Sequence, residues 1–302
     1  WNEIGTAQAA LVPEYENPSV LSITSLGSEN RFMVLEDNIL YIADDGPSKL
    51  RAVDVSDVAN PTILSEIDYS GNGIHSTNGI AIKDNFIYIP YFIPGNGGGI
   101  VIVDISNPNL MTYTDIYNVN YSYSSCFREG NTLYIMNSIT GELILYDITN
   151  AANPVITASI AGFYYGTTSG GSYIDQGSVY VENNIAYIHH TNPNASGGII
   201  SVVDLSDIQN LSIVGMVAVD TDAVDDIEVI TLKKYQNYLF LSTSDVVGQR
   251  GRIIDVSDPT NPFVTGQLMH QSTAYATAFD VASNFLYTID YSSPESISVQ
   301  DL

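Results

Sequence analysis

The stretch Ile253-Ile254-Asp255-Val256-Ser257-Asp258-Pro259-Thr260-Asn261-Pro262 is a short apolar run, an aspartate and a polar turn with two prolines. The same phrase recurs along the chain, as VDVSDVANP at 53–61, IVDISNP at 102–108, LYDITNAANP at 145–154 and VVDLSDIQN at 202–210. A clipped copy, SVQDL, stands at 298–302. The successive aspartates lie 43 to 57 residues apart, a period typical of propeller blades or solenoid coils.

A second phrase, Asn-x-x-aromatic, keeps step with the first, beginning at Asn38, Asn85, Asn131, Asn184, Asn237 and Asn284. Each period holds four short β-branched or aromatic runs bounded by turn residues, and no run shows a helical spacing of apolar residues. Four antiparallel strands repeated six times predict an all-β fold, a six-bladed β-propeller. The aromatic residue of the second phrase is Tyr in five units and Phe240 in the other, so we expect a core position that needs no hydroxyl.

The repeated phrase resembles the LVIVD repeat family, whose consensus runs apolar-apolar-Val-Asp-Val-Ser-Asp-Pro-x-x-Pro. The resemblance covers the chain from about residue 18 to Leu302 and implies a propeller scaffold, which does not by itself define a function. Two units depart from the consensus: the second shortens the turn to Ser106-Asn107-Pro108, and the fourth has Leu211 in place of a proline. We expect altered turns in these two units.

The two ends of the chain complement each other. Residues 17–23 match 60–66, which form the fourth strand of a unit, whereas the last unit stops after its third strand. We therefore predict that residues 18–26 pair with 296–302 and close the ring, which leaves no free sheet edge there. The predicted organisation is a lead-in segment, 1–16, and one propeller domain, 17–302.

The composition limits the partners. Nine Lys and Arg residues face 34 Asp and Glu residues, for a net charge of −25. Nucleic acids and anionic membranes require clustered cations, so both are excluded as expected partners. No apolar run is long enough for a transmembrane helix. The chain begins at Trp1 without methionine, and we expect a processed protein or part of a larger surface protein or assembly, placed outside the cell or at its surface.

The histidines are the candidate catalytic residues. In a propeller the connection before strand one and the hairpin between strands two and three open on one face, here called the loop face. All four histidines of the chain map to this face: His75, His189, His190 and His270. With carboxylates at the mouth of the central channel they would serve a hydrolase or lyase, although no metal-binding His-x-x-x-His or Glu-x-x-His spacing occurs.

Aromatic and acidic residues of the loop face are the candidate binding residues. Five tyrosines and one carboxylate outside the repeated positions are suited to stacking on sugars or gripping a protein, although packing within the loops is an equal alternative: Tyr91, Tyr123, Tyr164, Tyr165, Tyr173 and Asp175. An acidic run offers candidate calcium ligands, Asp222, Asp225 and Asp226. The repeated aspartates are instead expected to accept N–H groups of their own turns, and no cofactor is predicted.

The sequence contains no catalytic motif and one cysteine, Cys126, expected to be a buried, unreactive thiol. The first hypothesis is a non-catalytic extracellular or cell-surface binding or adhesion module that recognises a protein or glycan through its loop face. The alternatives are a hydrolase or lyase with a histidine and carboxylate site at the channel mouth, or a purely structural unit of a surface assembly.

Overall fold

The computed structural model describes residues 30–44, 48–57, 59–70, 76–77, 79–93, 97–118, 123–137, 139–163, 178–191, 198–219, 229–243, 251–267, 276–282, 285–290 and 296–301. The side chains of the last three ranges are not described. The predicted lead-in, 1–16, and the predicted closing strand, 18–26, lie outside the described residues.

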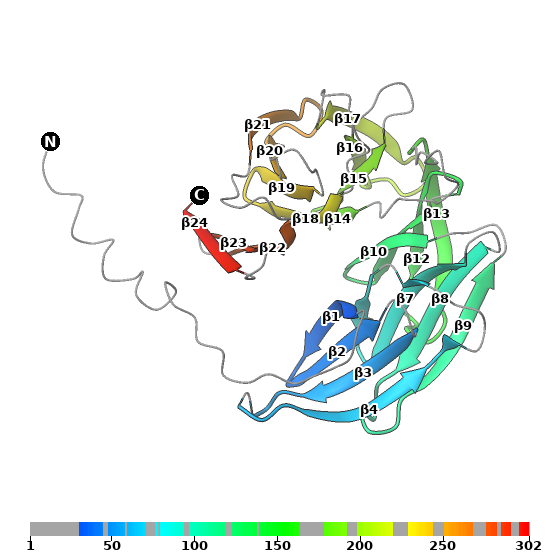
Figure 1. Cartoon of the computed structure of the whole chain (residues 1–302). Coiled ribbons are helices and arrows are strands. Elements are labelled where there is room, and N and C mark those ends of the chain that lie inside the picture. Colours follow the sequence, from blue (N-terminus) through cyan, green and yellow to red (C-terminus); the bar gives the residue numbers. More distant parts are fainter. Residues whose placement is uncertain are drawn as a thin grey trace, which may run out of the picture.

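Six antiparallel sheets follow one another along the described chain (Figure 1). The first sheet contains β1 (Asn30–Glu36), β2 (Ile39–Asp44), β3 (Lys49–Asp54) and β4 (Thr62–Asp68). The second contains β5 (Ser76–Thr77) and β6 (Ala81–Lys83), which both pair with β7 (Phe86–Ile93), and then β8 (Gly97–Asp104) and β9 (Thr112–Asn118). The third contains β10 (Tyr123–Glu129), β11 (Thr132–Asn137), β12 (Glu142–Asp147) and β13 (Val155–Ala161).

The fourth sheet contains β14 (Val179–Glu182), β15 (Ile185–Thr191), β16 (Gly198–Asp204) and β17 (Ser212–Ala218). The fifth contains β18 (Val229–Tyr235), β19 (Tyr238–Thr243), β20 (Gly251–Asp255) and β21 (Phe263–Gln267). The sixth has three strands, β22 (Ala276–Ala282), β23 (Phe285–Asp290) and β24 (Ser296–Asp301). The predicted all-β fold of four-stranded antiparallel units is confirmed for the first five sheets, and in the second sheet the place of the first strand is divided between β5 and β6, which both pair with β7.

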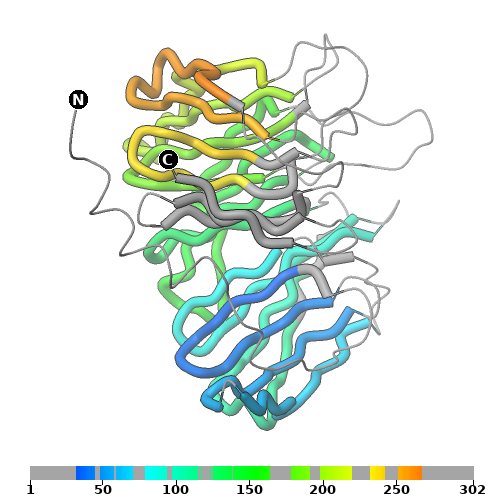
Figure 2. The backbone as a smooth tube through the Cα atoms, turned by 60° about the vertical axis from the view of Figure 1, so that its left-hand side comes forward, coloured from blue at the N-terminus to red at the C-terminus, as the bar shows by residue number. Residues whose placement is uncertain are grey.

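The hairpin between the first two strands of a sheet is built by the Asn-x-x-aromatic phrase. The residue before the asparagine has a positive φ of 52° to 57° at Asp37, Asp84, Gly130, Asn183 and Gln236. Such a φ suits the tight turn of a hairpin, where Asn, Asp and Gly are favoured. Figure 2 shows the β1–β2 hairpin (blue) and the β18–β19 hairpin (yellow) projecting on the same side of the molecule.

The two repeated phrases are joined by one backbone hydrogen bond in each of five sheets. The carbonyl of the hairpin asparagine accepts the N–H of the residue after the repeated aspartate at 2.8 Å, with donors Val55, Ile105, Ile148, Leu205 and Val256. The aspartate itself accepts the N–H two positions later at 2.7–2.9 Å, with donors Ser56, Ser106, Thr149, Ser206 and Ser257. The predicted turn-capping role of these aspartates is confirmed.

The turn after the repeated aspartate has the same form in the regular and the irregular units. Leu110 N–H bonds to Asn107 O in the second unit, and Asn210 N–H bonds to Asp207 O in the fourth, both at 2.9 Å. The corresponding bond in the fifth unit, from Asn261 to the carbonyl of Asp258, is 3.0 Å. The expectation of altered turns is therefore wrong, because a side-chain acceptor and this backbone bond, not the prolines, define the turn.

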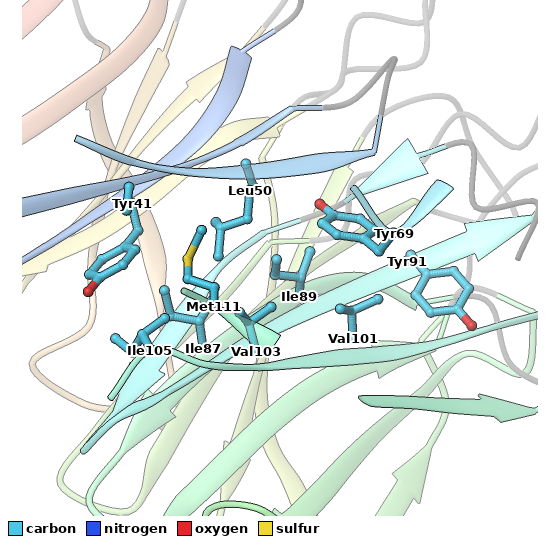
Figure 3. Packing of buried hydrophobic residues seen from close by; sticks show 12 residues of the cluster. Tyr41, Leu50, Tyr69, Ile87, Ile89, Tyr91, Val101, Val103, Ile105 and Met111 are labelled. Carbon is cyan, nitrogen blue, oxygen red and sulfur yellow. The ribbon is translucent and has the colours of Figure 1, made fainter. Parts of the chain in front are cut away.

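Each of the first four sheets packs on the next through the repeated aromatic residue. Tyr41, Tyr88, Tyr134, Tyr187 and Phe240 are at most 5% exposed. Tyr41 packs in the cluster between the first and second sheets, where Figure 3 shows it with Leu50 opposite Ile87 and Val103. The next three tyrosines occupy the following three junctions. The prediction that these positions form the core is confirmed, and sheets packed face to face in succession are the arrangement of a β-propeller.

In three of the repeated turns a carbonyl enters the preceding sheet. It belongs to the fourth residue after the repeated aspartate, which is Pro108, Ala151 or Pro259. Pro108 O accepts a hydrogen bond from Ser65 Oγ of the first sheet at 2.5 Å. Ala151 O accepts one from the hydroxyl of Tyr88 of the second sheet at 2.7 Å. Pro259 O lies against Gly215 of the fourth sheet, only 2.2 Å from where a Cβ would stand. We call this contact the turn joint.

The turn joint predicts unequal effects of two glycine substitutions. Gly215→Ala should lower the free energy of unfolding by about 1–3 kcal/mol, because its Cβ would overlap the Pro259 carbonyl. Gly266→Ala is the matched control, since Gly266 holds the equivalent position in the fifth sheet and its Cβ would meet Ile253 at an ordinary 3.5 Å. Urea denaturation measures both. Equal stability of the two variants would contradict the joint.

Candidate functional site

In each sheet, the strand that carries the repeated aromatic has a polar residue at the same register position, three residues after that aromatic. These positions are Asp44, Tyr91, Asn137, His190, Thr243 and Asp290. The first four, whose side chains are described, are at most 3% exposed, and we call them the polar belt. The belt lies close to where strand two runs into strand three, so it forms a buried layer at the loop-face end of the sheets.

In the first sheet the belt residue belongs to an ion network. Arg51 donates from Nη1 to Asp44 Oδ2 at 2.5 Å and from Nε to Glu66 Oε2 at 2.8 Å. Lys49 Nζ donates to the other oxygen of Glu66 at 2.5 Å. Burial raises the pKa of Asp44 even though Arg51 opposes the shift, whereas the hydrogen bond from Lys49 lowers the pKa of Glu66. The network holds two carboxylates and two cations on one face of one sheet.

In the fourth sheet the two adjacent histidines are both enclosed. His190 is 3% exposed, its Nε2 lies 2.8 Å from Ser201 Oγ, and its ring packs edge-on against Phe163 with centroids 5.5 Å apart. His189 is 4% exposed and lies so close to Gly198 that a Cβ there would be 2.4 Å from Nε2. Burial, and then the neighbouring His190, lowers the pKa of His189 to about 3.

The two described tyrosines of the predicted binding set are also core residues. Tyr91 is fully buried in the junction between the first and second sheets, next to Gly99. Tyr123 is 2% exposed, and its hydroxyl lies 2.6 Å from that of Tyr146. This placement does not support stacking of either ring on a ligand. Cys126 is partly buried, not fully buried as expected, but desolvation still raises the pKa of its thiol to about 12, which suits an unreactive cysteine.

The other predicted site residues lie outside the described residues. They are the histidines His75 and His270, the binding candidates Tyr164, Tyr165, Tyr173 and Asp175, and the calcium candidates Asp222, Asp225 and Asp226. Among the residues that are described, no group of three or more His, Cys, Asp or Glu side chains is placed to hold a metal ion. The described part of the chain also contains no helix long and apolar enough to span a bilayer.

The structure adds buried polar residues that the sequence reasoning missed. Arg51, Ser201 and Arg252 occupy one register position on the third strands of their sheets, and all are at most 9% exposed. Arg252 Nε donates across a junction to the carbonyl of Val219 in the fourth sheet at 3.1 Å. Comparing the residue three places after each repeated aromatic would have revealed the polar belt from the sequence.

The enclosed His189 predicts acid sensitivity. The unfolded chain binds a proton near pH 6.5 while the folded chain does not until about pH 3, so stability is present above pH 6.5 and falls as the pH drops below it. We expect a loss of about 2 kcal/mol between pH 7.5 and roughly pH 5. Urea titrations at both pH values should show this loss in the wild type and a smaller one in His189→Gln. Equal losses would contradict the enclosure of His189.

Solved structures at low sequence identity share the fold. A Lactobacillus plantarum protein superimposes with a TM-score of 0.72 at 11% identity, covering 90% of this chain and 81% of its own. The periplasmic gluconolactonase of Pseudomonas aeruginosa does so with a TM-score of 0.73 at 8% identity, covering 94% and 84%. A hypothetical selenium-binding protein from Sulfolobus tokodaii reaches 0.60 at 11% identity, covering 84% and 67%.

Sequence comparison identifies the repeat. No curated protein matches the chain. The LVIVD repeat pattern matches residues 33–68, 75–119 and 252–269, which include the first, second and fifth copies of the phrase described above. Together with the β-propeller arrangement of the sheets, this match shows that the chain is a repeat protein that contains LVIVD repeats.

Proposed function

We propose that the chain is a six-bladed β-propeller acting as a non-catalytic extracellular or cell-surface module that binds a protein or glycan through its loop face. The observation that carries the proposal is the enclosure of the histidines. His189 and His190, the two described candidates for catalysis, are 4% and 3% exposed within sheet junctions. A substrate would need to reach a ring nitrogen within about 3 Å for proton transfer, and the surrounding packing opposes this.

Closure of the ring is part of the proposal. Met33 and Leu35 of β1 are 69% and 56% exposed. The residues at the Met33 register position in the fourth and fifth sheets, Val179 and Leu232, are at most 7% exposed and pack against the preceding sheet. No sheet precedes the first one in the part of the chain that the structure describes. The sixth sheet, completed by a fourth strand from residues 18–26, would cover this face in the same way.

The binding surface is assigned to the loop face on chemical grounds. The belt beneath it is buried, so a partner meets the connections between strands two and three and those between sheets. These connections carry Tyr164, Tyr165, Tyr173 and Asp175. Tyrosine presents a rigid apolar ring with a wet hydroxyl, which suits both sugar stacking and protein interfaces. The net charge of −25 opposes polyanionic partners, so neutral or basic glycans and proteins are favoured.

The likeness to the Pseudomonas gluconolactonase favours a second candidate, a hydrolase at the channel mouth. In that case His75 or His270 of the loop face would act as general base on a small ester or lactone, or on a polysaccharide. Hydrolysis of glucono-lactone by the purified chain, abolished in both His75→Ala and His270→Ala, would establish the hydrolase in place of the binding module.

The binding role predicts separate effects on affinity and stability. On a glycan array and on immobilised extracellular-matrix proteins, Tyr164→Ala/Tyr165→Ala/Tyr173→Ala should lower binding at least about tenfold, because each lost ring removes a hot-spot contact. The melting temperature should change by only a few degrees, because loops lie outside the core. Tyr238→Ala is the matched control: this exposed tyrosine follows the β18–β19 hairpin on the opposite face. Equal binding by wild type and the triple variant would remove the site from these loops.

Ring closure predicts a sharp boundary in truncation. Removal of residues 1–26 should eliminate soluble monomer, because the sixth sheet would lose its fourth strand and expose β24 as an edge. Removal of 1–12 should leave the melting temperature unchanged. Size-exclusion chromatography and thermal melting of the two truncated chains provide the measurement. A stable monomer lacking 1–26 would refute closure by this strand.

A further inference from the structure

The face of the first sheet that is turned away from the second sheet has two different halves. Tyr41, Ala43, Leu50 and Ala52 pack toward the second sheet, so their alternating neighbours lie on the other face. At the hairpin end this other face presents Met33 and Leu35, which are exposed. At the loop-face end it presents the ion network of Asp44, Lys49, Arg51 and Glu66.

The equivalent half of other sheets is less charged. In the third sheet the register positions of Asp44, Arg51 and Glu66 hold Asn137, Ile144 and Ser159. Ile144 is 1% exposed and packs against the second sheet. In the fourth sheet a histidine and a serine, His190 and Ser201, take the place of Asp44 and Arg51. In the fifth, the cation Arg252 donates a hydrogen bond to the preceding sheet and so helps to hold the junction.

We infer that the outer face of the first sheet receives the sixth sheet, β22–β24, and that this junction is the weak seam at which the ring opens first. The inference rests on the proposed ring closure. The register also favours this occupant. Tyr287 of β23 is the repeated aromatic of the sixth sheet, and the equivalent residue of each of the first four sheets packs on the sheet that follows it.

The weakness of the seam follows from desolvation. The side chains of Lys49 and Glu66 are still 26% and 36% exposed, so closing the seam removes water from both charges. Burying charged groups is costly even when they are paired, whereas burying apolar surface is favourable. A junction that must desolvate these two charged side chains therefore opens at a lower free energy than a junction lined by isoleucines.

The chain carries internal reporters for this opening in its methionines. Met33 lies on the seam, Met136 is fully buried in the third sheet, and Met216 is 61% exposed on an outer strand. Peroxide oxidation followed by peptide mass spectrometry gives the rate at each thioether. In the wild type Met33 should oxidise at a rate between those of Met216 and Met136, because it reacts only when the seam is open.

Two variants test the cause. Asp44→Asn/Arg51→Ile/Glu66→Ser copies the third sheet and should slow oxidation of Met33 at least about fivefold, with Met216 unchanged. Arg51→Ile alone leaves the carboxylate of Asp44 without its guanidinium, and should speed oxidation of Met33 toward the rate of Met216. The oxidation rate of Met136 reports global unfolding. If Met136 also oxidises faster in Arg51→Ile, that variant is destabilised as a whole, and the rate of Met33 in the triple variant is then the test of the seam.

Each remaining outcome has a distinct meaning. Oxidation of Met33 at the rate of Met216 in every variant would show that nothing covers the face, which overturns ring closure itself. A Met33 as slow as Met136 in the wild type, and unaffected by the substitutions, would keep closure and overturn the weak seam. Protection of Met33 that rises with protein concentration, together with a dimer on size exclusion, would assign the face to a second copy and overturn the inference.

Discussion

The turn joint is the interaction on which the rest of the structure depends. A sheet of this kind is stable only if both of its faces are covered, and a turn carbonyl lodged in the preceding sheet sets how two sheets meet. The joint takes three forms, with a serine hydroxyl, a tyrosine hydroxyl or a bare glycine facing the carbonyl. In each case the carbonyl stands at one place in the repeated phrase. The geometry of the turn is therefore shared, and the chemistry of its partner varies.

The repeated aspartate matters because it prepares this joint. Its carboxylate accepts the N–H two positions on, and hydrogen bonds from the side chain and N–H of that Ser or Thr lower the pKa of Asp54, Asp147, Asp204 and Asp255. The carbonyl of the hairpin asparagine accepts a hydrogen bond from the N–H of the residue between the aspartate and that Ser or Thr. Two local phrases far apart within each unit thus hold one turn rigid, and that turn reaches the neighbouring sheet. Rigid local structure of this kind reduces the entropy lost when sheets dock.

The polar belt shows a different use of the same scaffold. The belt is a register position that is polar in the second strand of each sheet. It lies where the junctions meet the loop face, and its partners differ from sheet to sheet. In the first sheet Arg51 links the belt residue Asp44 to Glu66, and in the fourth the belt residue His190 lies against a serine. Buried polar groups contribute little net stability but penalise wrong pairings. The belt therefore gives the junctions different polar partners in a chain whose sheets are otherwise alike.

The sequence by itself determined the all-β architecture, the four short strands of each unit, the aspartate-capped turn and the buried aromatic of strand two. These features depend on local periodicity and turn chemistry, which repeat and can be compared unit by unit. Only the tertiary structure decided that His189, His190, Tyr91 and Tyr123 lie inside junctions, because residues at a strand end become buried or exposed according to the sheet that packs beside them. The ion network of Arg51 likewise needed the pairing of β2, β3 and β4, which brings residues 44, 51 and 66 together across strands.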